Sequence, residues 1–227
     1  MPDVTNADLN QRHSRAHEAE LITDPVQKAE AEALNGLRQF DAGRAIIRDM
    51  LERGSFKLRV SHLLSLQREA LMGISSYAGN FRPAGVAIEG SQHAPPEAYV
   101  VPELIEEMCD YVNNRWDTAT AIHLAAYIMW RLNWIHPFAD GNGRTSRTTS
   151  YVVLCIKLGS DLPGVPTIPD QIVENRKPYF DALDAADEAY RRGNVDVTKM
   201  EELLSGMLAK QLHGAYALAG GVAPGTA

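Results

Sequence analysis

A short segment in the second half of the chain concentrates residue types that bind phosphate and move protons. It reads His136-Pro137-Phe138-Ala139-Asp140-Gly141-Asn142-Gly143-Arg144-Thr145-Ser146-Arg147 and lies between two largely apolar helical patterns. A histidine can accept a proton near neutral pH, and an aspartate can hold Mg²⁺ against phosphate oxygens. The segment therefore predicts a nucleotide-phosphate site that carries its own base, His136, and a metal-holding carboxylate, Asp140.

The second half of this segment is suited to an anion. Gly141 and Gly143 let the backbone turn tightly and approach a ligand closely. Asn142 stands where it can cap the following helix, whose first N–H groups lack intrahelical partners and carry the positive end of the helix dipole. Arg144 and Arg147 are one helical step apart, so both guanidinium groups can clamp a polyphosphate from one side.

The whole segment matches the signature HxFx(D/E)GNGRxxR and in this resembles the Fic family, with Phe138 as a core anchor of the loop. The order of elements from about Val60 to Leu212 is similar to that family as well. A second stretch contains Gly79-Asn80-Phe81-Arg82, then Val86-Ala87-Ile88, then His93-Ala94-Pro95-Pro96. It resembles the family's flap, a β-hairpin over the active site that holds a target segment by strand addition.

The resemblance implies a reaction and a role for each matching residue. His136 would deprotonate a Tyr, Thr or Ser hydroxyl of a target protein, and the oxygen would attack the α-phosphorus of ATP and expel pyrophosphate. Asp140 would bind Mg²⁺. The implied nucleotide-binding residues are Gly141, Asn142, Gly143, Arg144 and Arg147 for the phosphates and Tyr179, Phe180 and Asp187 for the adenine, and the target-docking residues of the flap are Val86, Ala87 and Ile88.

Two other functions stay open beside this protein adenylyltransferase. One is the reverse reaction, removal of AMP from a modified protein, and the other is a non-catalytic nucleotide-sensing or adaptor role. Many members of the family restrain themselves with a motif (S/T)xxxE(G/N). The stretches Ser14–Glu18 and Thr198–Glu202 match only its first part, and Ile88-Glu89-Gly90 lacks the Ser or Thr. The sequence therefore leaves open whether an inhibitory glutamate exists and where it lies, and the N-terminal helix could pack on the site and regulate it.

The elements that must position these residues form an all-α bundle with one small β-hairpin as the flap. Apolar residues recur at three- and four-residue spacing, for example Leu124, Ile128 and Leu132. The predicted helices are 25–53, 57–74, 102–113, 118–134, 142–158, 171–191 and 197–213. The predicted organisation is a flexible N-terminal segment over 1–24, an N-terminal and regulatory helix over 25–56, a Fic domain over 57–214 and a disordered tail over 215–227.

Composition narrows the function classes. The chain has 227 residues and a formal net charge of -7, with no run of Lys and Arg that would neutralise a nucleic acid. It has no apolar run of membrane-spanning length and no signal-peptide core, which predicts a cytoplasmic protein without a membrane or nucleic-acid partner. Cys109 and Cys155 are predicted to be buried free thiols. The expected partners are ATP and a target protein with an acceptor hydroxyl; the oligomeric state, a homo-oligomer included, stays open.

Overall fold

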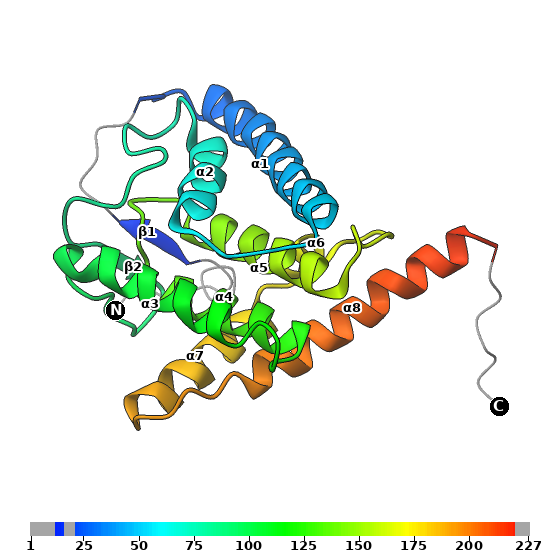
Figure 1. The fold of residues 1–227 in the computed structure, drawn as a ribbon. Coiled ribbons are helices and arrows are strands. Elements are labelled where there is room, and N and C mark those ends of the chain that lie inside the picture. The colour runs from blue at the N-terminus through cyan, green and yellow to red at the C-terminus, as the bar shows by residue number, and fades with distance from the viewer. Residues whose placement is uncertain (1–11, 16–20, 221–227) are drawn as a thin grey trace.

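The computed structural model describes residues 12–15 and 21–220, which form a helical bundle with one short two-stranded sheet (Figure 1). The predicted all-α class is confirmed. Among the described residues, no helix is both long and apolar enough to cross a bilayer. In chain order the elements are β1 (His13–Arg15), α1 (Pro25–Arg53), α2 (Val60–Leu71), β2 (Ala87–Glu89), a 3-10 turn (Ala98–Val100), α3 (Val101–Asn114), α4 (Ala121–Ile135), α5 (Asn142–Leu158), α6 (Ile168–Glu174), α7 (Lys177–Arg191) and α8 (Thr198–Leu218).

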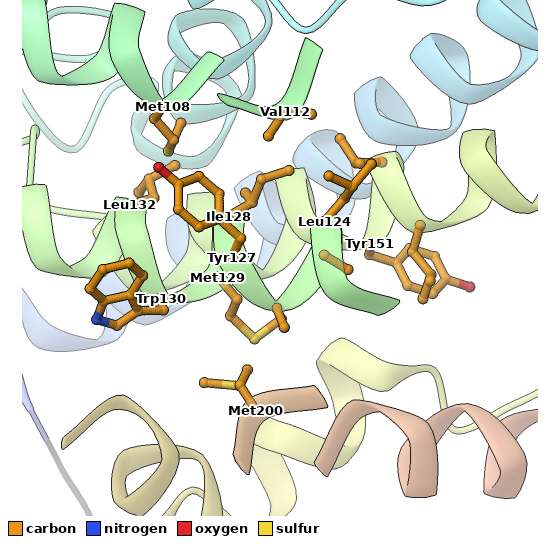
Figure 2. Packing of buried hydrophobic residues seen from close by; sticks show 14 of the residues in the cluster. Met108, Val112, Leu124, Tyr127, Ile128, Met129, Trp130, Leu132, Tyr151 and Met200 are labelled. Carbon is orange, nitrogen blue, oxygen red and sulfur yellow. The ribbon is translucent and has the colours of Figure 1, made fainter. Parts of the chain in front are cut away.

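Helix α4 is the centre of the core (Figure 2). Its residues are apolar on nearly every side, so it is stable only when neighbours surround it. It packs against α5 most extensively and against α3, α7 and α8. Leu124, Ile128 and Leu132 are fully buried, as their spacing predicts. Because α4 and α5 flank the motif segment, the core fixes both ends of the loop between them.

The helix ends follow the local sequence signals. Asp24 caps α1 by accepting from the backbone N–H of Gln27 at 2.8 Å, and Pro25 occupies the first helical turn. Gly54 and Gly159 end α1 and α5 in the left-handed conformation, with φ of 64° and 75°. These bounds agree with the predicted helices 25–53 and 142–158.

Four predicted helices differ from the structure by three residues or more at an end. The predicted helix 57–74 is the shorter α2, and the predicted helix 118–134 begins at Ala121 in α4. The predicted helix 171–191 is divided between α6 and α7, which break at Asn175 and Arg176. Pro178 lies in the first turn of α7, where its missing N–H costs nothing, whereas it would interrupt one continuous helix. Helix α8 continues to Leu218, into the segment predicted as a disordered tail. Residues 221–227 of that tail lie outside the described residues.

The sheet differs from the predicted hairpin in its partner strand. Strand β2 pairs antiparallel with β1, in the register His13↔Glu89, Ser14↔Ile88 and Arg15↔Ala87. The chain that follows β2 contains Pro95 and Pro96, which have no N–H to donate to a ladder, so a local return strand is disfavoured. The partner comes instead from the segment predicted as flexible, of which 1–11 and 16–20 lie outside the described residues.

Candidate active site

His136 lies directly after α4 and turns the chain into the motif loop. Its φ of 51° is left-handed, which is uncommon for a residue with a side chain, and its N–H donates to the carbonyl of Leu132 at 2.9 Å. The residue is 6% exposed. Such a conformation persists only where the surrounding structure enforces it, and it occurs disproportionately at functional sites.

The hydrogen bonds of the His136 ring define which nitrogen can act as a base. Nδ1 lies 3.2 Å from the carbonyl oxygen of Asn133, and a carbonyl can only accept, so Nδ1 carries the proton. Nε2 therefore presents its lone pair to the Oγ of Ser14, 2.8 Å away. Burial is the main cause that lowers the pKa of His136 to about 4, so the ring is neutral near pH 7.

Asn142 holds the loop in its shape rather than capping α5. The sequence places it as a cap, but Gly141 is the N-cap residue and Asn142 is the first residue of the helix. Its Oδ1 accepts from the N–H of Phe138 at 2.9 Å, and its Nδ2 donates to the carbonyl of Phe138 at 2.8 Å. Phe138 itself is fully buried, as predicted for a core anchor. Gly141 has φ of 80°, and a Cβ there would overlap Leu71, so glycine is required.

Arg82 clamps the loop from the other side. Its Nε donates to the carbonyl of His136 at 2.8 Å, and its backbone N–H donates to the carbonyl of Pro137 at 2.9 Å. The guanidinium also donates to the carbonyls of Ala84 and Pro96, so it ties the stretch around β2 to the motif loop. The Gly-Asn-Phe-Arg run was the only sequence signal for this role, and a structural clamp could not be read from it.

A pocket of about 320 Å³ lies between the loop, α7 and the β1–β2 sheet, within the range of roughly 300–1,000 Å³ for small-molecule sites. It brings together every residue that the sequence assigns to the base, the phosphates, the metal and the adenine. Of the flap residues only Ile88 lines it; Val86 and Ala87 do not. The sequence-predicted residues at the pocket are Ile88, His136, Asp140, Gly141, Asn142, Gly143, Arg144, Arg147, Tyr179, Phe180 and Asp187.

Arg147 is a cation of this pocket that could bind an anion. Within the described part of the chain, its guanidinium forms no ion pair with a carboxylate, whereas Arg144 pairs with Asp140 at 3.0 Å and lies 3.9 Å from Glu32. Burial lowers the pKa of Arg147, and the neighbouring Tyr179 opposes that effect. A guanidinium stays charged in proteins, and that of the half-buried Arg147 faces no carboxylate of the described chain that would balance its charge. The pocket is therefore suited to an anionic ligand.

Asp140 has the properties of a single-carboxylate magnesium ligand. Its Oδ1 accepts from the N–H of Gly141 at 2.6 Å, its Oδ2 accepts from Arg144, and the side chain is 47% exposed. The described residues contain no group of three or more His, Cys, Asp and Glu side chains placed to hold a metal. Mg²⁺ commonly keeps several waters and binds one or two carboxylates plus phosphate oxygens, so this donor fits it when a nucleotide supplies the rest.

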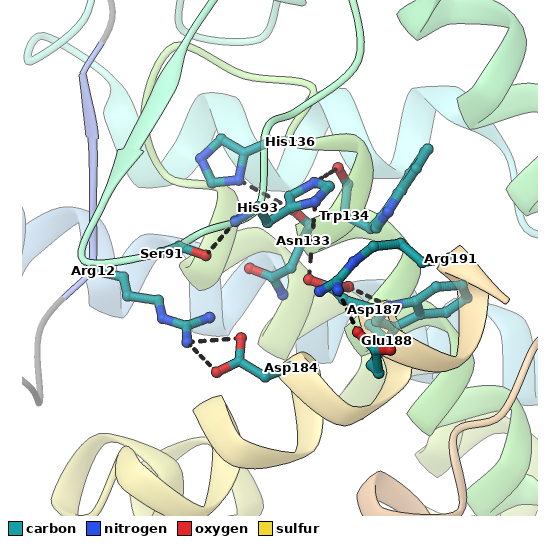
Figure 3. A network of polar contacts seen from close by, with 11 residues as sticks. Arg12, Ser91, His93, Asn133, Trp134, His136, Asp184, Asp187, Glu188 and Arg191 are labelled. Atoms are coloured by element: carbon teal, nitrogen blue, oxygen red, sulfur yellow. Dashed lines mark hydrogen bonds and ion pairs between the residues drawn. The ribbon is translucent and has the colours of Figure 1, made fainter.

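The adenine candidates lie on α7 and have partners of their own. The hydroxyl of Tyr179 accepts from Nδ2 of Asn133 at 2.8 Å, and Oδ1 of Asp187 accepts from Nε1 of Trp130 at 2.8 Å. Burial raises the pKa of Asp187. Figure 3 shows Asp187 below His93, and Oδ2 of Asp187 lies 3.9 Å from Nδ1 of His93. Tyr179 and Asp187 thus line the pocket and also connect α7 to α4 by hydrogen bonds to Asn133 and Trp130.

Asn133, Arg12 and Ser14 are among the residues of the site that are missing from the sequence-based assignment. The backbone carbonyl of Asn133 accepts from Nδ1 of His136, and its side-chain amide donates to Tyr179 and Ser146. An amide three residues before the motif histidine, at the end of an apolar helix, was a usable signal. Arg12 and Ser14 line the pocket from β1. The sequence holds no local signal for their placement, because it depends on pairing with a strand far along the chain.

One glutamate of the N-terminal helix lies at the site, whereas the glutamates of the two partial motifs do not line it in the described part of the chain. Helix α1 packs on α5, and Glu32 from α1 lines the pocket near Arg144. Glu202 lies on α8 and does not line it, and Glu18 lies outside the described residues. A regulatory role of residues 25–56 stays a prediction.

The chain is similar to known proteins over part of its length. Residues 57–154 match the model of the Fic/DOC family. A protein adenylyltransferase Fic from Drosophila willistoni is 31% identical over 134 residues, covering 58% of this chain and 25% of the relative. A probable protein adenylyltransferase from Aquifex aeolicus is 30% identical over 108 residues, covering 48% of this chain and 31% of the relative. This chain thus spans between a quarter and a third of these relatives.

Among solved structures, Fic-1 (residues 134–508) from C. elegans has a similar fold. The TM-score is 0.67 at 19% sequence identity, and the match covers 88% of this chain and 54% of that chain. At this identity the likeness concerns the fold alone. It agrees with the helical bundle described above.

The buried His136 predicts a specific dependence of stability on pH. The folded-state pKa of about 4 is below the ordinary histidine pKa of 6.5, so between these values the unfolded chain binds the additional proton. The free energy of unfolding should therefore fall as the pH drops through this window. Urea denaturation at several pH values measures it. His136→Asn should lose less stability than the wild type over the window, and exposed His213→Asn should match the wild type. Equal slopes for all three proteins would contradict burial of a neutral His136.

Proposed function

This chain is a Fic domain protein, and from that premise we propose that it transfers AMP from ATP to a hydroxyl of a protein. The observation that carries the proposal is the 2.8 Å distance between the unprotonated Nε2 of His136 and the Oγ of Ser14. This contact lies inside a pocket that is lined by arginine side chains and suited to an anion. The relatives from Drosophila willistoni and Aquifex aeolicus, a protein adenylyltransferase and a probable one, support the same reaction.

The phosphates of ATP bind at the start of α5. This helix has no side-chain cap, so its first N–H groups are available to an anion, and they carry the positive end of the helix dipole. Gly143 keeps this approach open, and Arg147 supplies the unpaired charge on the same side. Arg144 donates to the phosphates when its guanidinium gives up its ion pair with Asp140. The adenine then extends toward Tyr179, Phe180 and Asp187 on α7.

His136 acts as the general base. Nε2 takes the proton of the acceptor hydroxyl, and the freed oxygen attacks the α-phosphorus of ATP. The new oxygen–phosphorus bond forms while the bond to pyrophosphate breaks, and pyrophosphate leaves with its electron pair. Proton transfer to Nε2 is favoured because the carbonyl of Asn133 stabilises the proton on Nδ1 throughout. The loop positions these groups before the reaction, which is how phosphoryl-transfer sites lower the barrier.

Asp140 is the residue that would hold Mg²⁺ in this reaction. The metal would supply charge neutralisation for the phosphates. The chain contributes one half-exposed carboxylate beside the phosphate site, and its exposure leaves room for metal-bound water. Arg144 is the partner that Asp140 would release on metal binding.

Replacement of the base tests the proposal most simply. The chain is incubated with α-³²P-ATP, Mg²⁺ and a cell lysate, and label on protein is quantified. His136→Ala should lower labelling by about 10²- to 10⁴-fold, the usual contribution of a general base. Exposed His213→Ala should label as the wild type does. Unchanged labelling by His136→Ala would exclude it as the base. Label removal from AMP-modified proteins would favour the reverse reaction, and ATP binding without either activity would favour a nucleotide-sensing role.

Removal of the unpaired guanidinium tests the phosphate assignment. We expect Arg147→Ala to weaken ATP binding by roughly 10- to 100-fold, the effect of losing a charge-assisted hydrogen bond of about 1.5–3 kcal/mol. Calorimetric titration measures the change, with exposed Arg53→Ala as the matched control. If Arg147 binds the γ-phosphate, binding of ADP should change far less than binding of ATP. Equal affinities of wild type and Arg147→Ala for ATP would refute the assignment.

A further inference from the structure

The edge of β2 is occupied by a strand of the same chain. Strand addition to β2 is the way in which a target segment is expected to dock, and β1 already makes that antiparallel pairing (Figure 1). Backbone pairing of this kind recognises an extended peptide with little dependence on its sequence. The residues of β1 therefore occupy the place in which a target would lie.

Ser14 is the residue of β1 that faces the site. It pairs with Ile88 across the sheet, and both residues line the pocket. The Oγ of Ser14 lies 2.8 Å from Nε2 of His136 and 3.4 Å from Nδ2 of Asn142. Because Nδ1 of His136 donates to the Asn133 carbonyl, Nε2 can only accept, so the hydroxyl of Ser14 is the donor. This is the contact that an acceptor hydroxyl must make with a general base.

Arg12 fixes the register that places Ser14 there. Side chains two positions apart lie on the same face of a strand, so Arg12 also points toward the pocket. Its guanidinium forms an ion pair with Asp184 at 2.7 Å (Figure 3). The guanidinium carbon also lies 4.5 Å from the centre of the Phe180 ring. A slip of one residue would turn both Arg12 and Ser14 to the opposite face. Strand β1 is thus held by backbone pairing with β2 and by the side-chain contacts of Arg12 and Ser14.

We propose that Ser14 is an intramolecular acceptor of AMP, so that the N-terminal strand is a substrate of the chain's own active site. This inference rests on the proposed function. The Ser14 hydroxyl gives its proton to Nε2 of His136, its oxygen attacks the α-phosphorus of ATP, and the bond to pyrophosphate breaks. The products are O-adenylyl-Ser14 and pyrophosphate. The bulky AMP group then prevents Ser14 from resting against His136, so modification frees the β2 edge for a target.

The experiment uses the full chain with Mg²⁺ and α-³²P-ATP, in the presence and absence of a cell lysate. Intact-mass measurement before and after incubation should show the gain of one AMP, and peptide mapping should place it on Ser14. Ser14→Ala should lose at least nine-tenths of the label on the chain, whereas Ser14→Thr keeps a hydroxyl and should keep label. Exposed Ser205→Ala serves as the matched control and should label as the wild type does.

Three results would overturn the inference. They are label on another residue of the chain, wild-type labelling in Ser14→Ala, and no label on the chain at all. In the first two cases the label on the chain itself would show that the proposed transferase activity stands. With no label on the chain, labelled lysate proteins would show that this activity stands, and their absence as well would show that it fails too. Mixing a Ser14→Ala chain with a size-tagged His136→Ala chain tests the intramolecular step. Label on the tagged chain would show transfer between molecules and contradict it.

Discussion

The hydrogen bond between Nδ1 of His136 and the carbonyl of Asn133 is the contact on which the chemistry of the site depends. It fixes the proton on Nδ1 and leaves Nε2 with a lone pair that faces the pocket. The bond exists because α4 ends at Ile135 and the chain turns back in a left-handed conformation at His136. Burial then keeps the ring neutral, so Nε2 is free to accept a proton near physiological pH, as the proposed base must.

The rest of the fold holds this turn in place. The buried helices α4 and α5 fix the two ends of the loop, and Asn142 closes it with two hydrogen bonds to Phe138. Arg82 attaches the stretch around β2 to the loop carbonyls, so the proposed docking edge and the proposed base are held together. A site built in this way would need little rearrangement during the proposed group transfer, and such preorganisation is a main source of catalysis in reactions of this kind.

The features predictable from the sequence are those encoded over a few residues. Helix 142–158 and the pocket residues of the 136–147 segment follow from periodicity, capping signals and one motif. The role of Asn142 was missed because a cap and a first helical residue differ by one position, which the sequence does not resolve. The β1–β2 pairing, and with it Ser14, could not be predicted. Strands of three residues carry no periodicity, and their pairing depends on contacts between distant segments.

The tautomer of His136 is the most direct test of the central claim, because base, docking edge and acceptor are all defined relative to it. The full chain labelled with ¹⁵N at histidine is suited to NMR long-range proton–nitrogen correlation at about pH 7, with His136→Asn assigning the signal. The structure predicts a neutral ring with its proton on Nδ1 and a bare Nε2. A proton on Nε2, or an imidazolium with both nitrogens protonated, would contradict the account.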